Sequence, residues 1–150
     1  MRKNIQIGEK TFTMDCSLGT AYLYRCLTGN DLMEVFTKLG NLKREAQPVI
    51  AKMVKKEQLT AEERQILFSN TDLFKEESRE IAYKMAYVMT VQGAFEDPSE
   101  HVEEMEALMT EKDYRKWTFK VGMSEFDAQV QAEIIGLWTN NQKTLSESKN

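Results

Sequence analysis

The sequence predicts a mainly α-helical protein of the α+β type, with a β-hairpin at its start. Apolar and polar residues alternate between residues 4 and 15, whereas beyond residue 18 apolar residues recur mainly at helical spacing. The seven glycines and two prolines are scattered between those helical segments. We expect a single compact domain over 1–138, with the hairpin over 4–15 and helices over 18–138. The polar segment 139–150 is expected to be a disordered tail.

The hairpin is indicated by alternation on both sides of a turn. Ile5 and Ile7 precede Gly8, and Phe12 and Met14 follow it, with polar residues between them. An isolated hairpin is only marginally stable in water. We therefore expect it to pack on the helices or to pair with another edge, such as that of a second copy.

Two helices meeting at a corner are predicted between Gly19 and Gly40. Gly29 can adopt the left-handed conformation that ends a helix, and either Thr28 or Asp31 has the spacing of a capping box for the next helix. Gly40 is expected to end that second helix. Its apolar stripe is Leu32, Val35, Phe36 and Leu39.

Two further helices are predicted in the middle of the chain before the most apolar one. The first is basic, covers 42–57 and has Pro48 in its first turn. The second begins with a capping box at Leu59 and Thr60, and its expected core residues are Ile66, Leu67 and Phe68.

The longest buried helix is expected from about Asp72 to Gln92, with Gly93 as its stop. An acidic helix should begin at Asp97 and Pro98. The segment 114–121 fits both a strand and a helix, and we favour a helix. Ser124 is expected to cap the last helix, whose inner residues are Phe126, Val130, Ile134, Leu137 and Trp138.

Charge is distributed unevenly, although the net charge is only -4. Basic residues dominate between Lys38 and Glu57, and acidic residues dominate between Glu96 and Asp113. Two solvated helix faces explain this pattern, and so does a dipolar molecule that associates head to tail with itself. The basic segment from Lys43 to Lys56 is also compatible with an alternative function, that of a small adaptor or regulator that binds nucleic acid or protein. The absence of aromatic residues there and the acidic total disfavour nucleic acid.

No residue pattern indicates catalysis, a cofactor or a metal site. The single histidine, His101, shares a helix face with Asp97 and Glu104, but structural zinc usually takes four ligands, and we expect a solvated side chain. The glycines are too isolated for a phosphate-binding loop. Cys16 and Cys26 are expected to be reduced core thiols. Because no residue pattern indicates catalysis, we expect a protein that is not an enzyme. No sequence window approaches the ~18 apolar residues of a membrane span, so we also expect the protein to be soluble and cytoplasmic.

Methionine is frequent, with nine residues in the chain. Such side chains fill irregular cores, and they also form adaptable surfaces for helical partners. Both interpretations remain open for the methionines at core spacing, which are Met33, Met53, Met85, Met89, Met105 and Met109.

Three segments carry a family resemblance. They are Gly19-Thr-x-Tyr-x-Tyr-Arg-x-Leu-Thr-Gly-x-Asp-Leu32, Ala82-Tyr-x-Met-Ala-Tyr-Val-Met, and Glu133-Ile-Ile-Gly-Leu-Trp-Thr-Asn-Asn-Gln-Lys143. In this order, after a short hairpin, they resemble the tail assembly chaperones of long-tailed phages and prophages of Gram-positive bacteria. The residues that define the pattern here are Tyr22, Arg25, Gly29, Asp31, Leu32, Leu137 and Trp138.

The resemblance implies a non-enzymatic protein of the host cytoplasm. It would bind the long, helical tape measure protein and keep it soluble until the tail tube protein polymerises around it. It would also form homo-oligomers, and a ribosomal frameshift after Trp138 would give a longer second product. Candidate contact residues are apolar and aromatic, although core packing is the competing interpretation of each; they are Tyr24, Tyr87, Met109, Tyr114 and Trp117.

Overall fold

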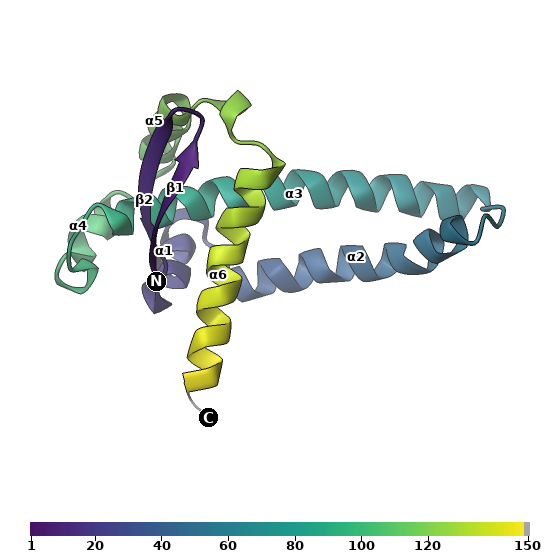
Figure 1. The fold of residues 1–150 in the computed structure, drawn as a ribbon, viewed down its shortest axis with the longest axis horizontal. Coiled ribbons are helices and arrows are strands. Elements are labelled where there is room, and N and C mark those ends of the chain that lie inside the picture. Colours follow the sequence, from purple (N-terminus) through teal and green to yellow (C-terminus); the bar gives the residue numbers. More distant parts are fainter. Residues whose placement is uncertain (149–150) are drawn as a thin grey trace. The chain divides into compact units, whose positions relative to one another are not determined.

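The computed structural model describes residues 1–148, with side chains described for residues 1–122 and 124–141. It is mainly α-helical with one antiparallel hairpin near the N-terminus, which confirms the predicted fold class (Figure 1). The chain forms two compact units. Unit 1 contains Met1–Asp31 and the chain from Ile81 onward, and unit 2 is Leu32–Glu80. That residues 1–138 form a single domain stays a prediction.

The hairpin consists of β1 (Arg2–Ile7) and β2 (Lys10–Asp15), paired so that Ile7 lies opposite Lys10. Gly8 has φ 63°, which a two-residue turn at this point requires and which glycine adopts without steric cost. Ile5, Ile7 and Met14 are buried, so the predicted alternation places one face of the hairpin against the helices.

Helix α1 (Leu18–Thr28) begins with a capping box in which Ser17 and Thr20 satisfy each other's backbone N–H groups. It ends at Gly29, whose φ of 78° is the left-handed cap predicted from the sequence. The predicted end of the first helix is therefore confirmed.

Unit 2 consists of α2 (Leu32–Val54) and the first part of α3 (Ala61–Gly93). The predicted breaks at Gly40, before Pro48 and near Asn70 are wrong, because each helix continues through them. An interior glycine costs only about 1 kcal/mol relative to alanine, which a packed helix tolerates. Asn70 does not cap a new helix; its Nδ2 donates to the Leu42 carbonyl at 3.3 Å.

The second part of α3, from Ile81 to Gln92, is the most buried segment of unit 1, as predicted. Its end lies against the hairpin, and Gly93 permits this approach. A Cβ at Gly93 would lie 2.1 Å from the Thr13 carbonyl oxygen. The glycine is therefore needed for packing, and α3 ends at this residue, as predicted, without the left-handed φ that Gly29 has.

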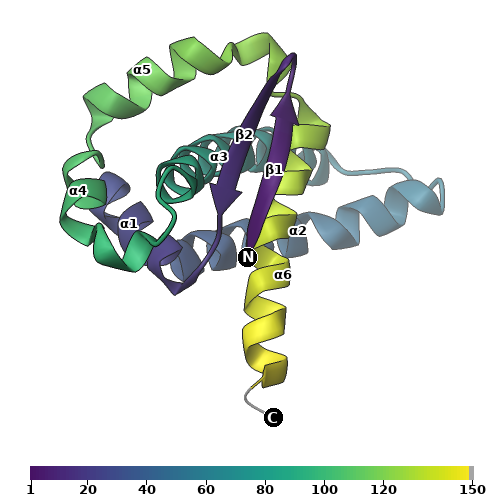
Figure 2. The ribbon, with the colours of Figure 1, turned by 60° about the vertical axis from the view of Figure 1, so that its left-hand side comes forward.

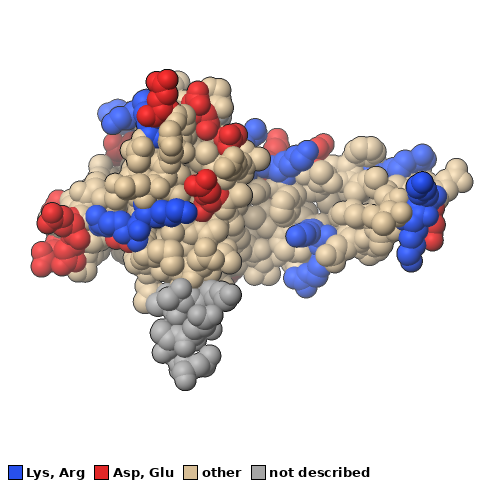
Figure 3. Space-filling view, in the orientation of Figure 1, with Lys and Arg blue, Asp and Glu red and all other residues tan. Residues whose placement is uncertain are grey.

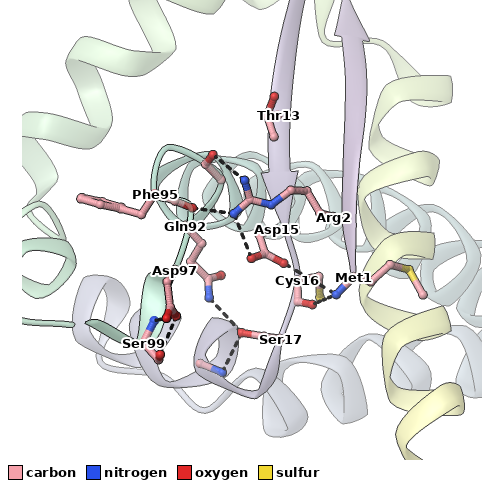
Figure 4. Close-up of polar contacts among 12 residues, drawn as sticks. Met1, Arg2, Thr13, Asp15, Cys16, Ser17, Gln92, Phe95, Asp97 and Ser99 are labelled. Atoms are coloured by element: carbon pink, nitrogen blue, oxygen red, sulfur yellow. Dashed lines mark hydrogen bonds and ion pairs between the residues drawn. The ribbon is translucent and has the colours of Figure 1, made fainter. Parts of the chain in front are cut away.

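A polar network holds the same junction together (Figure 4). The Arg2 guanidinium donates to the Phe95 carbonyl at 2.5 Å and lies 3.4 Å from Asp15. The Met1 ammonium donates to the Cys16 carbonyl at 2.7 Å. The bond to Phe95 joins the open end of the hairpin to the chain that leaves α3, and the other two contacts hold the two strand ends together.

Five helical segments follow in unit 1. They are the short 3₁₀ turn η1 (Pro98–Glu100), α4 (Val102–Ala107), α5 (Glu111–Val121), the 3₁₀ turn η2 (Met123–Glu125) and α6 (Ala128–Ser148). The ambiguous segment 114–121 is helical, as favoured.

Two predictions about α6 need correction. Asp127, and not Ser124, caps it, because Asp127 Oδ1 accepts from the Val130 N–H at 3.0 Å. The helix also does not end at the predicted start of the tail. It continues from Trp138 to Ser148, and Asn141 is buried, while residues 149–150 of the predicted tail lie outside the described residues.

Candidate binding surfaces

The five residues predicted to contact a partner are buried in unit 1. Their exposed fractions lie between 3% for Tyr24 and 8% for Trp117. Tyr87 packs edge-on against Tyr114 and tilted against Trp117, with ring centroids 5.8 Å apart in both pairs, and its hydroxyl donates to the Leu108 carbonyl at 2.5 Å. Burial, with a smaller contribution from Asp113, raises the pKa of Tyr87 to about 12. Tyr87, Tyr114 and Trp117 therefore form a core between α3 and α5, and Tyr24 and Met109 are also buried, so the competing interpretation of core packing describes all five residues in this conformation.

The residues of the family pattern divide between structure and surface. Gly29 is the helix cap, and Leu32, Leu137 and Trp138 are buried. Tyr22 is half exposed, and Arg25 and Asp31 are exposed. The pattern therefore describes mainly how the helices pack.

Unit 2 has almost no core of its own. Within Leu32–Glu80, all of which the structure describes, the buried side chains are Leu32, Leu39, Ala46 and Val49. Two helices alone cannot enclose all their apolar residues, so many remain in solvent. The large exposed ones are Met33, Ile50, Met53, Val54, Ile66, Phe68 and Leu73. The predicted core roles of Ile66 and Phe68 are therefore wrong, and Met33 and Met53 are surface residues.

Part of this surface forms an open apolar groove of about 660 Å³, here called the unit 2 groove. Val54 and Phe68 are its most exposed apolar residues, at 78% and 66%. Asp72 and Lys75 supply one charge of each sign. The groove is lined by Ile50, Met53, Val54, Leu67, Phe68, Thr71, Asp72 and Lys75.

The basic residues of α2 are partly paired within unit 2. Lys52 lies 2.8 Å from Glu63, and Lys38 lies 2.9 Å from Glu77. The hydrogen bond between Lys52 and Glu63 raises the pKa of Lys52 and lowers the pKa of Glu63. Figure 3 shows Lys and Arg side chains at the end of unit 2 where α2 and α3 connect. Carboxylates already pair with two of the four basic residues of α2, which are Lys38, Lys43, Arg44 and Lys52, and this pairing weakens the case for nucleic acid binding through this helix.

A smaller pocket of about 230 Å³ lies in unit 1, between α1, α4 and the end of α3; it is called the α1–α4 pocket below. Its floor includes Gln92, which is 1% exposed and links the hydroxyls of Thr20 and Ser17 by hydrogen bonds of 2.7 and 3.1 Å. Its walls are mainly apolar. They comprise Ser17, Gly19, Tyr22, Leu23, Gln92, Pro98, Ser99, Val102 and Met105.

The residues considered for chemistry do not gather in one place. His101 stacks on Phe95 at 4.7 Å, and its Nδ1 lies 2.9 Å from Glu104, which raises the pKa of the imidazole. No three metal-ligating side chains come together among the described residues. Both cysteines are free thiols; Cys16 is buried as predicted, but Cys26 is exposed.

Sequence reasoning missed one surface residue that a face assignment could have found. Phe119 on α5 is 87% exposed, the highest fraction among the large apolar residues described. Tyr114, Trp117 and Val121 define the buried face of α5, and Phe119 is two positions from both Trp117 and Val121, so it must point away from that face.

Comparison with protein-family models, with curated proteins and with solved structures finds no match to this chain. Within the part of the chain that is described, no helix combines the length and the apolar character needed to cross a bilayer.

Proposed function

We propose that this protein is a tail assembly chaperone of the host cytoplasm. It binds the tape measure protein and keeps it soluble until tail tube subunits displace it. The observation that carries the proposal is the unit 2 groove, an apolar surface formed by two helices that bury few residues between them. The family resemblance supplies the identity of the client, and the proposal needs no catalytic residue.

The groove has the chemistry of a helix-binding surface. Met53 and Phe68 offer flexible and aromatic contacts, which adapt to varied apolar partners. An amphipathic client helix would place its i, i+3, i+4 and i+7 residues in such a groove. Exposing apolar surface of this kind to water is unfavourable, so its burial under a client helix would contribute favourably to the free energy of binding.

Co-expression with a tape measure protein tests the proposal. The wild-type chain should keep that client in the soluble fraction and elute with it. Phe68→Asp places a charge in the groove and should leave the client insoluble. Leu18→Asp is the matched control, because Leu18 is a similarly exposed apolar residue, at 72%, that lies in unit 1.

Two outcomes would reject the proposal. One is a client that remains insoluble although the wild-type chaperone is abundant and folded. The other is equal solubilisation by the wild type and Phe68→Asp, which would place binding outside the groove. Circular dichroism of each variant separates loss of binding from loss of folding.

A further inference from the structure

The outer face of α5 has an unusual composition. Phe119 shares this face with Lys112, Arg115 and Lys116, which lie seven, four and three residues before it. All four side chains are exposed. Arg115 Nε lies 4.0 Å from Glu111, and both side chains of this pair are exposed. A phenyl ring that is 87% exposed on this basic face has no packing role within its own chain. It suits a partner that offers an apolar pocket with an acidic rim.

The α1–α4 pocket has these two properties. At about 230 Å³ it is below the ~300–1,000 Å³ of typical small-molecule sites, and it suits a single side chain. Two of its lining residues, Tyr22 and Val102, are exposed at 50% and 40% and form part of its rim. The wall of the pocket is therefore mainly apolar, and part of it is accessible to a partner.

Acidic residues lie on α4, which forms one side of this pocket. Glu103 and Glu106 are exposed on α4, and Glu106 interacts with the hydroxyl of Tyr22 in the pocket wall. Figure 3 shows the acidic side chains gathered over α4. Opposite charges on two surfaces favour their encounter and fix their orientation.

Phe119 and the pocket lie at opposite ends of the hairpin. Lys120, next to Phe119, accepts a hydrogen bond from Lys10 at the hairpin turn, whereas Ser17 of the pocket follows the other end of β2. In Figure 2, α5 runs from α4 to the tip of the hairpin. The ring therefore cannot fill the pocket of its own chain.

We propose that Phe119 of one copy inserts into the α1–α4 pocket of a second copy, while the basic face of α5 lies against Glu103 and Glu106. The two surfaces differ, so the contact is heterologous, and its repetition produces rings or open chains. The inference goes beyond the proposed function and does not depend on it.

Sedimentation velocity over ~1 μM to ~1 mM protein tests the contact. The wild type should associate, and association should weaken as salt is raised, because exposed charges are screened. Phe119→Ala should lower the association constant by about 10- to 100-fold, the effect of removing one buried phenyl ring. Val102→Arg should act similarly by placing a cation in the pocket that receives the basic face of α5.

Mixing the two variants is the decisive experiment. Phe119→Ala keeps an intact pocket, and Val102→Arg keeps an intact Phe119. Their mixture should form a 1:1 heterodimer that does not extend, whereas each variant alone stays monomeric. Leu73→Ala and Met33→Arg are the controls, because Leu73 and Met33 are exposed apolar residues, at 44% and 57%, that line neither the unit 2 groove nor the α1–α4 pocket, and both variants should associate like the wild type.

Three results would overturn the inference. The first is a wild type that stays monomeric at ~1 mM. The second is undiminished association of Phe119→Ala. The third is a mixture that gives no heterodimer although both variants have the wild-type circular dichroism spectrum and melting temperature. Loss of client binding in Phe119→Ala with unchanged self-association would assign the ring to the client and also reject the contact.

Discussion

Replacing Gly93 by alanine tests whether the hairpin packs directly on the end of α3. The added Cβ would lie 2.1 Å from the Thr13 carbonyl oxygen and 3.2 Å from the Met14 Cα. Both neighbours are backbone atoms of β2, so relief requires the strand to move away from the helix. Strand movement would also disturb Met14, which is fully buried.

Two effects of opposite sign compete at this position. Alanine in place of a helical glycine stabilises by about 0.5–1 kcal/mol. Overpacking costs about 1–3 kcal/mol and more where the backbone must shift. The cost of overpacking exceeds the gain in helix propensity, so we expect the free energy of unfolding to fall by about 2 kcal/mol. For a chain of this size, that loss lowers the melting temperature by roughly 4–8 °C.

Thermal and urea unfolding followed by circular dichroism would measure this loss. Gly136→Ala is the matched control, since Gly136 lies within α6 and an added Cβ there meets nothing within 4 Å. It should stabilise the protein by about 0.5–1 kcal/mol. If Gly93→Ala is as stable as Gly136→Ala, the close contact between α3 and β2 does not exist.

Three further perturbations give independent checks. Gly29→Ala forces a side chain into φ 78° and should cost about 1 kcal/mol or more in urea unfolding, whereas unchanged stability would contradict the left-handed cap. The hydrogen bond to Glu104 raises the pKa of His101, so the pair stabilises the fold at low pH, and this contribution is lost as the pH rises through the raised pKa. In a proton NMR titration, Glu104→Gln should lower the pKa of His101. An unchanged titration curve would refute the pairing. Cys26 should react at once with a thiol reagent in the native protein, while Cys16, whose pKa burial raises, should react only on unfolding; simultaneous reaction would contradict their different burial.

Local backbone chemistry made part of the fold predictable. Gly8 and Gly29 occupy positive φ values, which few other residues adopt, so the hairpin turn and the end of α1 could be predicted from their immediate neighbours. The helical spacing of Tyr114, Trp117 and Val121 was likewise sufficient to favour a helix for a segment that also resembled a strand.

Helix lengths were not predictable in the same way. Gly40, Pro48 and Asn70 all favour a helix boundary locally, yet α2 and α3 continue through them. The side chain of Asn70 bonds to α2 through Leu42 and Glu45, a contact between residues far apart in sequence. Such tertiary contacts override local preference, and no local pattern reveals them.

The same limit applies to the candidate surfaces. Aromatic residues such as Tyr87 and Phe68 have similar sequence signals, but one is 4% exposed and the other 66%. The difference arises because α5 covers Tyr87, whereas the two helices of unit 2 leave Phe68 uncovered. Only knowledge of which helices are neighbours distinguishes a core residue from a contact residue.

The two proposed surfaces use separate residues, and this separation has a consequence for assembly. The unit 2 groove and the α1–α4 pocket share no lining residue. A copy that holds a client helix through Phe68 therefore still has Phe119 and its pocket free for neighbouring copies. A long client would then bind an array more tightly than a single copy, because neighbours raise the local concentration of grooves.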